Sequence, residues 1–64
     1  MTSLKKKRLE KEITQYDLSL GTGVPPSYIS LAERGYSVLK PHHKKAIADF
    51  LGVKNIQELF SEMK

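Results

Sequence analysis

Closely spaced glycines and prolines limit this 64-residue chain to short structural elements. They are Gly21, Gly23, Pro25, Pro26, Gly35, Pro41 and Gly52. The segments between them are too short for anything but brief helices or strands. Strand signals are weak, because the chain has neither sustained alternation of apolar and polar residues nor an Asn-Gly or Asp-Gly turn. We therefore predict an all-α fold: one compact domain over residues 1–64, built from five short helices.

Composition and size exclude several classes of function. The chain has no cysteine, so it forms neither disulfides nor thiolate zinc sites. No apolar run approaches the roughly 20 residues of a membrane span, and residues 1–12 are too charged for a signal peptide. The sequence shows no nucleophile with a matched base, no paired carboxylates and no phosphate-binding glycine loop. We expect a cytoplasmic protein that is not an enzyme and uses no cofactor, metal or membrane.

Positive charge is concentrated in two blocks. Residues 1–12 carry five basic and two acidic side chains, and residues 34–45 carry four basic side chains and no acidic one. With a net charge of +4, this distribution favours a polyanionic partner. Both blocks are also consistent with solvated helix faces, and for the run Lys5-Lys-Lys-Arg8 that interpretation competes with a nucleic-acid arm.

Capping residues predict where the helices begin and end. The first helix is expected from Ser3, as N-cap, to about Lys11. Thr14 is the predicted N-cap of the second helix, with Asp17 as the acid of a capping box, and Gly21-Thr-Gly23 ends that helix. Three more helices are predicted, from Pro25 or Pro26 to Gly35, from Pro41 to Gly52, and after Asn55, which pairs with Glu58 as a cap.

Apolar residues recur at helical spacing and identify the candidate core. The inward positions are Leu18, Val24, Ile29, Ala32, Ile47, Ala48, Leu51, Val53, Ile56, Leu59 and Phe60. Leu59 and Phe60 fit a core or a dimer interface equally well. With Ile29 and Ala32 facing inward, the third helix keeps an outer face free for a partner.

The stretch from Gln15 to Arg34 has the organisation of two helices joined by a tight turn. Two helices that cross steeply need a small residue where their backbones approach, and Ser19 is one. The turn needs a residue that tolerates positive φ, which Gly23 does. A short helix with a free outer face fits the DNA major groove. We place this helix-turn-helix at about residues 14–35.

Several motifs in order resemble the lambda-repressor-like, Xre-type helix-turn-helix family over about residues 4–60. They are Arg8-Leu-Glu-Lys, Ile13-Thr-Gln-x-x-Leu-Ser, Thr22-Gly-Val, Ser27-Tyr-Ile-Ser, Glu33-Arg-Gly, Ala48-x-x-Leu-Gly-Val and Leu59-Phe. The resemblance implies a bacterial or phage-encoded transcriptional regulator that binds double-stranded DNA. It further implies a repressor that acts as a homodimer on an inverted-repeat operator, with half-sites about one helical turn apart.

The resemblance also implies roles for individual residues. Those expected at the DNA are Thr14 and Gln15 at the backbone, Pro25, Pro26, Ser27, Tyr28 and Leu31 at the base edges, and Arg34, Tyr36, Lys40, His43 and Lys44 at the backbone. Arg8 and Glu33 match a partly buried structural ion pair, although both are also plausible as exposed residues. His42-His43 is not expected to bind metal, since adjacent helical residues diverge and no third ligand lies nearby.

The expected base-reading surface departs from the common pattern. Relatives often place Gln, Arg, Lys or Asn where this chain has Pro26 and Leu31. Ser27 and Tyr28 offer hydrogen bonds, Leu31 suits a thymine methyl group, and Tyr28 also suits a packing role. Specificity then depends on DNA shape and apolar contacts, or the fold serves a protein partner as an antitoxin or assembly adaptor. A third interpretation is the detached DNA-binding part of a longer regulator.

Overall fold

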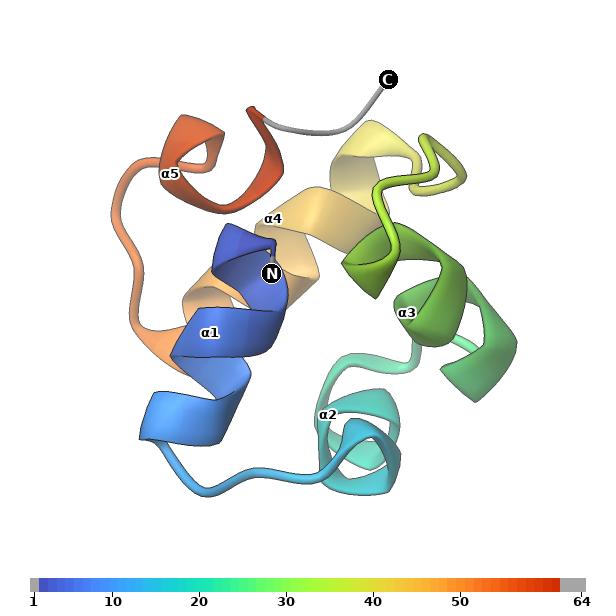
Figure 1. The fold of residues 1–64 in the computed structure, drawn as a ribbon, viewed down its shortest axis with the longest axis vertical. Helices are drawn as coiled ribbons and strands as arrows, with labels where there is room; N and C mark the ends of the chain where they lie inside the picture. The colour runs from blue at the N-terminus through green and yellow to red at the C-terminus, as the bar shows by residue number, and fades with distance from the viewer. Residues whose placement is uncertain (1, 62–64) are drawn as a thin grey trace.

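The computed structural model describes residues 2–61, and all regular secondary structure in that range is helical. The helices are α1 (Ser3–Glu10), α2 (Gln15–Thr22), α3 (Pro26–Glu33), α4 (Pro41–Leu51) and α5 (Gln57–Phe60). The prediction of an all-α bundle of five short helices is confirmed (Figure 1). No helix within residues 2–61 has the length and apolar character needed to cross a bilayer.

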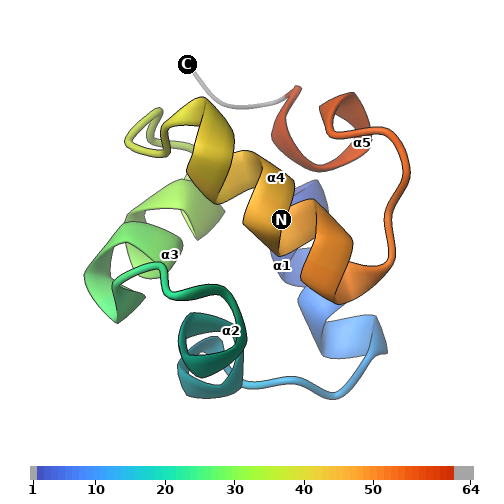
Figure 2. The same cartoon turned by 180° about the vertical axis from the view of Figure 1, so that it is seen from behind.

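The helices form two groups joined by α4. In Figure 1, α2 and α3 lie on one side of the molecule, and α1 and α5 lie on the other. Figure 2 shows the opposite face, where α4 runs between the two groups. The described chain measures 24 × 22 × 21 Å along its principal axes. The three dimensions are nearly equal, and α2 and α3 occupy one side of this compact shape.

The beginning of α1 differs from the prediction. Thr2, not Ser3, is the N-cap: its Oγ1 accepts a hydrogen bond from Lys5 N at 3.3 Å. The same hydroxyl donates to the carbonyl of Glu33 at 3.1 Å. This second bond joins α1 to the end of α3, and it explains why the helix begins one residue earlier than the capping preference of serine indicated.

The capping box and the turn of the helix-turn-helix are confirmed. Thr14 Oγ1 accepts from Asp17 N at 3.0 Å, and Asp17 Oδ2 accepts from Thr14 N at 3.3 Å. Gly23 follows α2 with φ +78°, and its amide donates to the carbonyl of Ser19 at 2.8 Å. The Ser19 hydroxyl donates to the carbonyl of Val24 at 2.7 Å, so it satisfies a polar group within the turn.

Gly21 does not end α2, contrary to the prediction, because it lies inside the helix. A Cβ atom at this position would overlap the ring of Phe50 on α4. The missing side chain at Gly21 thus leaves room for the Phe50 ring against α2. The sequence pattern predicted a small residue at a helix crossing only for Ser19, so this role of Gly21 was not predicted.

The remaining helix ends follow the prediction except at α5. Pro26 is the first residue of α3, and Gly52 follows α4 with φ +72°. Before α5, Asn55 Oδ1 accepts from Gln57 N at 3.0 Å, while Glu58 contributes its backbone amide to the carbonyl of Asn55. The expected capping box of Asn55 with Glu58 is therefore wrong. Asn55 caps the helix from two residues before its first residue.

The core lies between the two helix groups. Its buried apolar side chains are Leu4, Leu18, Val24, Ile29, Ala32, Leu39, Ile47, Ala48, Leu51, Val53, Leu59 and Phe60, with Ile56 partly buried against them. Leu59 and Phe60 are 2% and 6% exposed, so both are core residues of the monomer. Ile29 and Ala32 fix the inner face of α3 and leave its outer face at the surface.

Candidate nucleic-acid interface

A buried ion pair sets α3 against α1. Arg8 Nε lies 2.6 Å from Glu33 Oε2, Arg8 Nη2 lies 3.1 Å from Glu33 Oε1, and both side chains are buried. Arg8 Nη1 donates to the carbonyl of Ile13 at 2.7 Å. The hydrogen bond to Glu33 raises the pKa of Arg8 further, against the opposing effect of burial. This bidentate pair places the end of α3 relative to α1 and to the segment leading into α2.

The same carboxylate holds the beginning of α2. Gln15 Nε2 donates to Glu33 Oε1 at 3.0 Å. The first residue of α2 is thereby bound to the last residue of α3. Thr14, beside it, is exposed and caps the helix. The early backbone amides of α2 therefore lie at the surface next to α3.

Five residues make up the surface that we call the α3 outer face. They are Pro25, Pro26, Ser27, Tyr28 and Leu31. The first four are exposed, Tyr28 at 40%, and Leu31 is half-buried. None of the five is charged. Two consecutive prolines restrict the backbone where the helix begins, and the hydroxyls of Ser27 and Tyr28 are the side-chain hydrogen-bonding groups of this surface.

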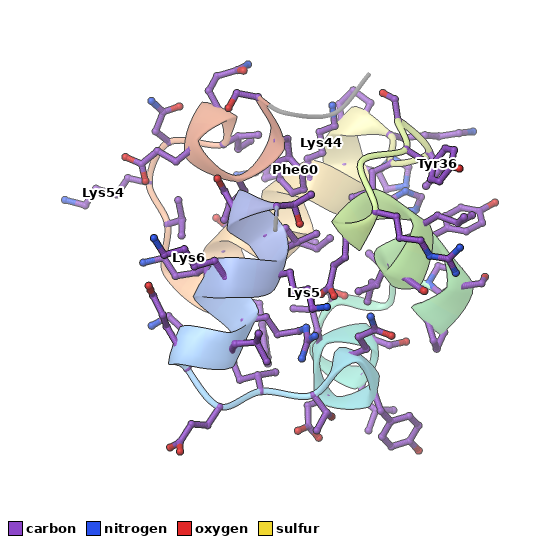
Figure 3. All side chains as sticks on the ribbon, in the orientation of Figure 1. Lys5, Lys6, Tyr36, Lys44, Lys54 and Phe60 are labelled. Carbon is purple, nitrogen blue, oxygen red and sulfur yellow. The ribbon has the colours of Figure 1, made fainter. Side chains whose placement is uncertain are left out.

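A basic segment follows the α3 outer face along the chain. Arg34 is exposed at the end of α3, and its Nη2 lies 3.5 Å from the Ser30 hydroxyl. The amide of Tyr36 donates to the carbonyl of Leu31 at 3.1 Å, which folds the loop back against α3. The Tyr36 side chain is 56% exposed and projects outward (Figure 3). Lys40, also exposed, is the N-cap residue of α4.

Lys44 differs from the other cations expected at the DNA. Its Nζ lies 5.7 Å from the centre of the Phe60 ring, which is a cation–π distance (Figure 3). The side chain is half-buried and directed toward α5. Lys44 therefore contributes to packing between α4 and α5, in addition to any contribution to the surface charge.

His43 has an arrangement that sequence analysis missed. Its Nδ1 accepts a hydrogen bond from Lys40 N at 3.2 Å, and its ring meets the Tyr28 ring edge-on, with the ring centres 5.8 Å apart. The centre of the His42 ring lies 4.2 Å from the centre of the His43 ring. Partial burial, together with the charges of His42 and Lys40, lowers the pKa of His43 below the ordinary histidine value. The available signal was its place in the first turn of α4, where a side-chain acceptor caps the preceding amide.

Hydrogen bonds and a ring contact connect four of the expected site residues to neighbouring elements. Gln15 joins α3 through Glu33, and Tyr28, His43 and Lys40 are joined by the ring contact and the capping bond. Arg34 and Tyr36 continue directly from α3. Within residues 2–61, no three His, Cys, Asp or Glu side chains gather in a geometry that suits a metal ion.

Two short helices joined by a left-handed glycine, with one outer face exposed and followed by basic residues, define a DNA-binding helix-turn-helix domain. The profile of a helix-turn-helix family matches residues 4–59. The chain therefore belongs to the lambda-repressor-like, Xre-type helix-turn-helix family and is a DNA-binding protein of the kind that regulates transcription. No curated protein and no solved structure gave a match.

Proposed function

We propose that this protein is a sequence-specific repressor that binds an inverted-repeat operator as a homodimer, in the cytoplasm of a bacterium or a phage-infected cell. The observation that carries the proposal is the α3 outer face, which is exposed, free of acidic groups and followed by Arg34 and Lys40. An exposed helix of this size enters the major groove of B-DNA, and cations beside it neutralise phosphates.

Phosphate contacts are assigned to both flanks of the α3 outer face. On one flank, the first-turn amides of α2 beside Thr14 and Gln15 offer donors at the positive end of a helix dipole. On the other, Arg34, Tyr36 and Lys40 offer two charges and a hydroxyl. Contacts of this kind set the register of the protein on the duplex without reading its sequence.

Base contacts are assigned to Ser27, Tyr28 and Leu31. The two hydroxyls accept or donate in the major groove, and Leu31 contacts a thymine methyl group. The α3 outer face has no Arg, Asn or Gln for a bidentate contact to guanine or adenine. We therefore infer that much of the preference for one DNA sequence over another comes from the shape and deformability of the operator.

Selection from a random duplex library, followed by sequencing, tests this proposal most directly. A recovered palindrome with half-site centres about 10 base pairs apart supports a dimer on an inverted repeat. A single conserved half-site supports sequence-specific binding by a monomer. Recovery of no motif contradicts sequence-specific recognition.

Charge reversal provides a matched test of the assigned surface. The double variant Arg34→Glu with Lys40→Glu should weaken binding to the selected duplex by about 100-fold or more, because phosphate contacts are replaced by repulsion. The control is Lys6→Glu with Lys54→Glu, which changes net charge equally at exposed residues away from Tyr36 (Figure 3). Binding is measured by fluorescence anisotropy. Equal losses in both variants would contradict localised phosphate contacts at Arg34 and Lys40, and a larger loss in the control would place the DNA elsewhere on the protein.

A protein partner is the second candidate function. The apolar residues Pro25, Pro26 and Leu31 on the α3 outer face favour it, since such residues suit a protein groove as well as a thymine methyl group. In that case the fold serves as an antitoxin or assembly adaptor. Reversal of Arg34 and Lys40 would then spare partner binding, whereas Leu31→Glu would abolish it.

A further inference from the structure

His43 connects the beginning of α4 to the α3 outer face. The hydrogen bond from Lys40 N to Nδ1 restrains the plane of the imidazole ring, and this ring forms a T-shaped pair with the ring of Tyr28, with an angle of 79° between the two planes. Tyr28 is 40% exposed, so much of its ring lacks protein neighbours. The ring contact with His43 is one restraint on how Tyr28 is presented to solvent or to DNA.

The hydrogen bond determines which protonation state of His43 is compatible with this arrangement. An imidazole nitrogen that accepts a hydrogen bond carries no proton, so the proton of the neutral ring is on Nε2. A protonated imidazole has donors at both nitrogens and cannot accept from Lys40 N. It would also place a cation at the positive end of α4.

The groups found around His43 come from three places in the fold. His42 precedes it on α4, Lys40 lies before the helix, and the phenol ring of Tyr28 contacts it from α3. Lys44, the next residue, directs its ammonium group toward Phe60. Partial burial, and after it the electrostatic effects of His42 and Lys40, lower the pKa of His43.

We propose that His43 is a positioning residue for sequence discrimination: its neutral ring, oriented by the Lys40 amide, holds Tyr28 in the conformation that reads the operator. The proposal rests on the proposed DNA-binding function. When His43 takes up a proton, the capping bond breaks and Tyr28 loses its restraint. The added charge at the same time increases attraction to the phosphates of any duplex.

The direction of the pH dependence follows from the lowered pKa. The cap is present above the ordinary histidine pKa and is lost as pH falls through the lower pKa of the folded protein. Affinity for a non-operator duplex should therefore rise with acidity. Discrimination is defined as the ratio of the two dissociation constants. It should fall about fivefold between pH ~7.5 and ~5, the change expected if the full stabilisation by one helix cap is coupled to operator binding.

An NMR titration without DNA tests the capping bond separately from DNA binding. The ¹⁵N shifts of His43 should report the Nε2–H tautomer at neutral pH, and the Lys40 amide should shift with the same midpoint as His43. In His43→Gln, the amide oxygen can accept from Lys40 N without titrating, so the Lys40 shift should stay constant. If the chemical shift of the Lys40 amide does not change when His43 is protonated, the proposal is overturned.

Binding measurements at constant ionic strength test the consequence for recognition. Operator and scrambled duplexes are compared at both pH values for the wild type, His43→Gln, His42→Gln and Tyr28→Ala. Discrimination should depend on pH in the wild type and in His42→Gln, the matched control, which keeps the cap. It should be independent of pH in His43→Gln, and both lower and independent of pH in Tyr28→Ala.

The outcomes separate the two proposals. If no duplex is preferred at either pH, sequence-specific DNA binding fails, and the NMR titration still decides whether His43 caps α4. If the operator is preferred equally at both pH values in the wild type, DNA binding stands and the role of His43 is overturned. If Tyr28→Ala keeps the pH dependence of the wild type, His43 does not act through Tyr28.

Discussion

Two turn residues, Glu12 and Gly23, adopt left-handed backbone conformations for different reasons. Gly23 has φ +78° in the turn between α2 and α3, and a Cβ there would meet no atom within 4 Å. Glu12 has φ +56° between α1 and α2, where the segment must turn so that Ile13 accepts from Arg8. An L-residue with a side chain pays about 1 kcal/mol for this conformation.

Opposite stability changes are expected at these two positions. Gly23→Ala should lower the free energy of unfolding by about 1 kcal/mol, since the cost is conformational and not steric. Glu12→Gly should raise it by up to about 0.5 kcal/mol, because the entropy gained by the unfolded chain offsets part of the relieved strain. Urea denaturation followed by circular dichroism measures both. Unchanged stability in Gly23→Ala would mean that the turn does not require left-handed backbone.

Sequence analysis predicted Gly23 but could not find Glu12. A glycine between two helical segments is a local signal, whereas nothing about glutamate indicates positive φ. The left-handed conformation of Glu12 belongs to the end of α1, where the amide of Ile13 donates to the carbonyl of Arg8. Gly21 was misassigned for a different reason, since its role depends on Phe50, a residue distant in sequence. Residue roles defined by long-range neighbours are not accessible from local patterns.

The relative placement of α1, α2 and α3 depends on one buried carboxylate. Glu33 accepts from Arg8 on α1 and from Gln15 on α2, and its carbonyl accepts from Thr2. Because the carboxylate and guanidinium are desolvated, removing one partner leaves an unpaired buried charge. The geometry of the helix-turn-helix is therefore coupled to the stability of the whole fold.

Arg8→Ala should destabilise the protein by about 3–5 kcal/mol, because it leaves Glu33 buried without its cation. Lys7→Ala is the matched control: Lys7 lies 3.8 Å from Glu10 in an exposed pair, and its loss should cost about 0.5 kcal/mol or less. Thermal unfolding distinguishes the two. A midpoint in Arg8→Ala as high as in Lys7→Ala would show that the buried pair adds no net stability.

At the level of elements, the sequence predicted which helices exist better than where each one begins. Proline and glycine mark helix ends through local backbone preferences, and they predicted the bounds of α3 and α4 correctly. The N-cap of α1 was missed because Thr2 is selected by a bond to Glu33, 31 residues away. The proposed site residues were predicted from the family resemblance, whereas the contact of His43 with Tyr28 could be found only in the structure, since it depends on how the beginning of α4 lies against α3.

For the molecule as a whole, the distribution of cations determines how binding should depend on salt. Each cation that neutralises a phosphate contributes about 0.9 to the slope of log affinity against log salt concentration. Lys40→Ala should reduce that slope by about 1. Lys44→Ala should reduce it less, because the ammonium group lies over Phe60, and Lys54→Ala should leave it unchanged. Equal reductions in all three variants would indicate a diffuse electrostatic interaction.

The ion pair between Arg8 and Glu33 also restricts the routes by which this protein can evolve. A domain of this size has only about 3–5 kcal/mol of stability, so losing one charge of the pair consumes most of it. A protein that carries either single substitution is therefore unstable, and this makes stepwise replacement of the pair unfavourable. Replacing both residues with apolar ones of similar volume avoids the unpaired charge. The two positions should change together among descendants, and randomised libraries should recover them as a unit.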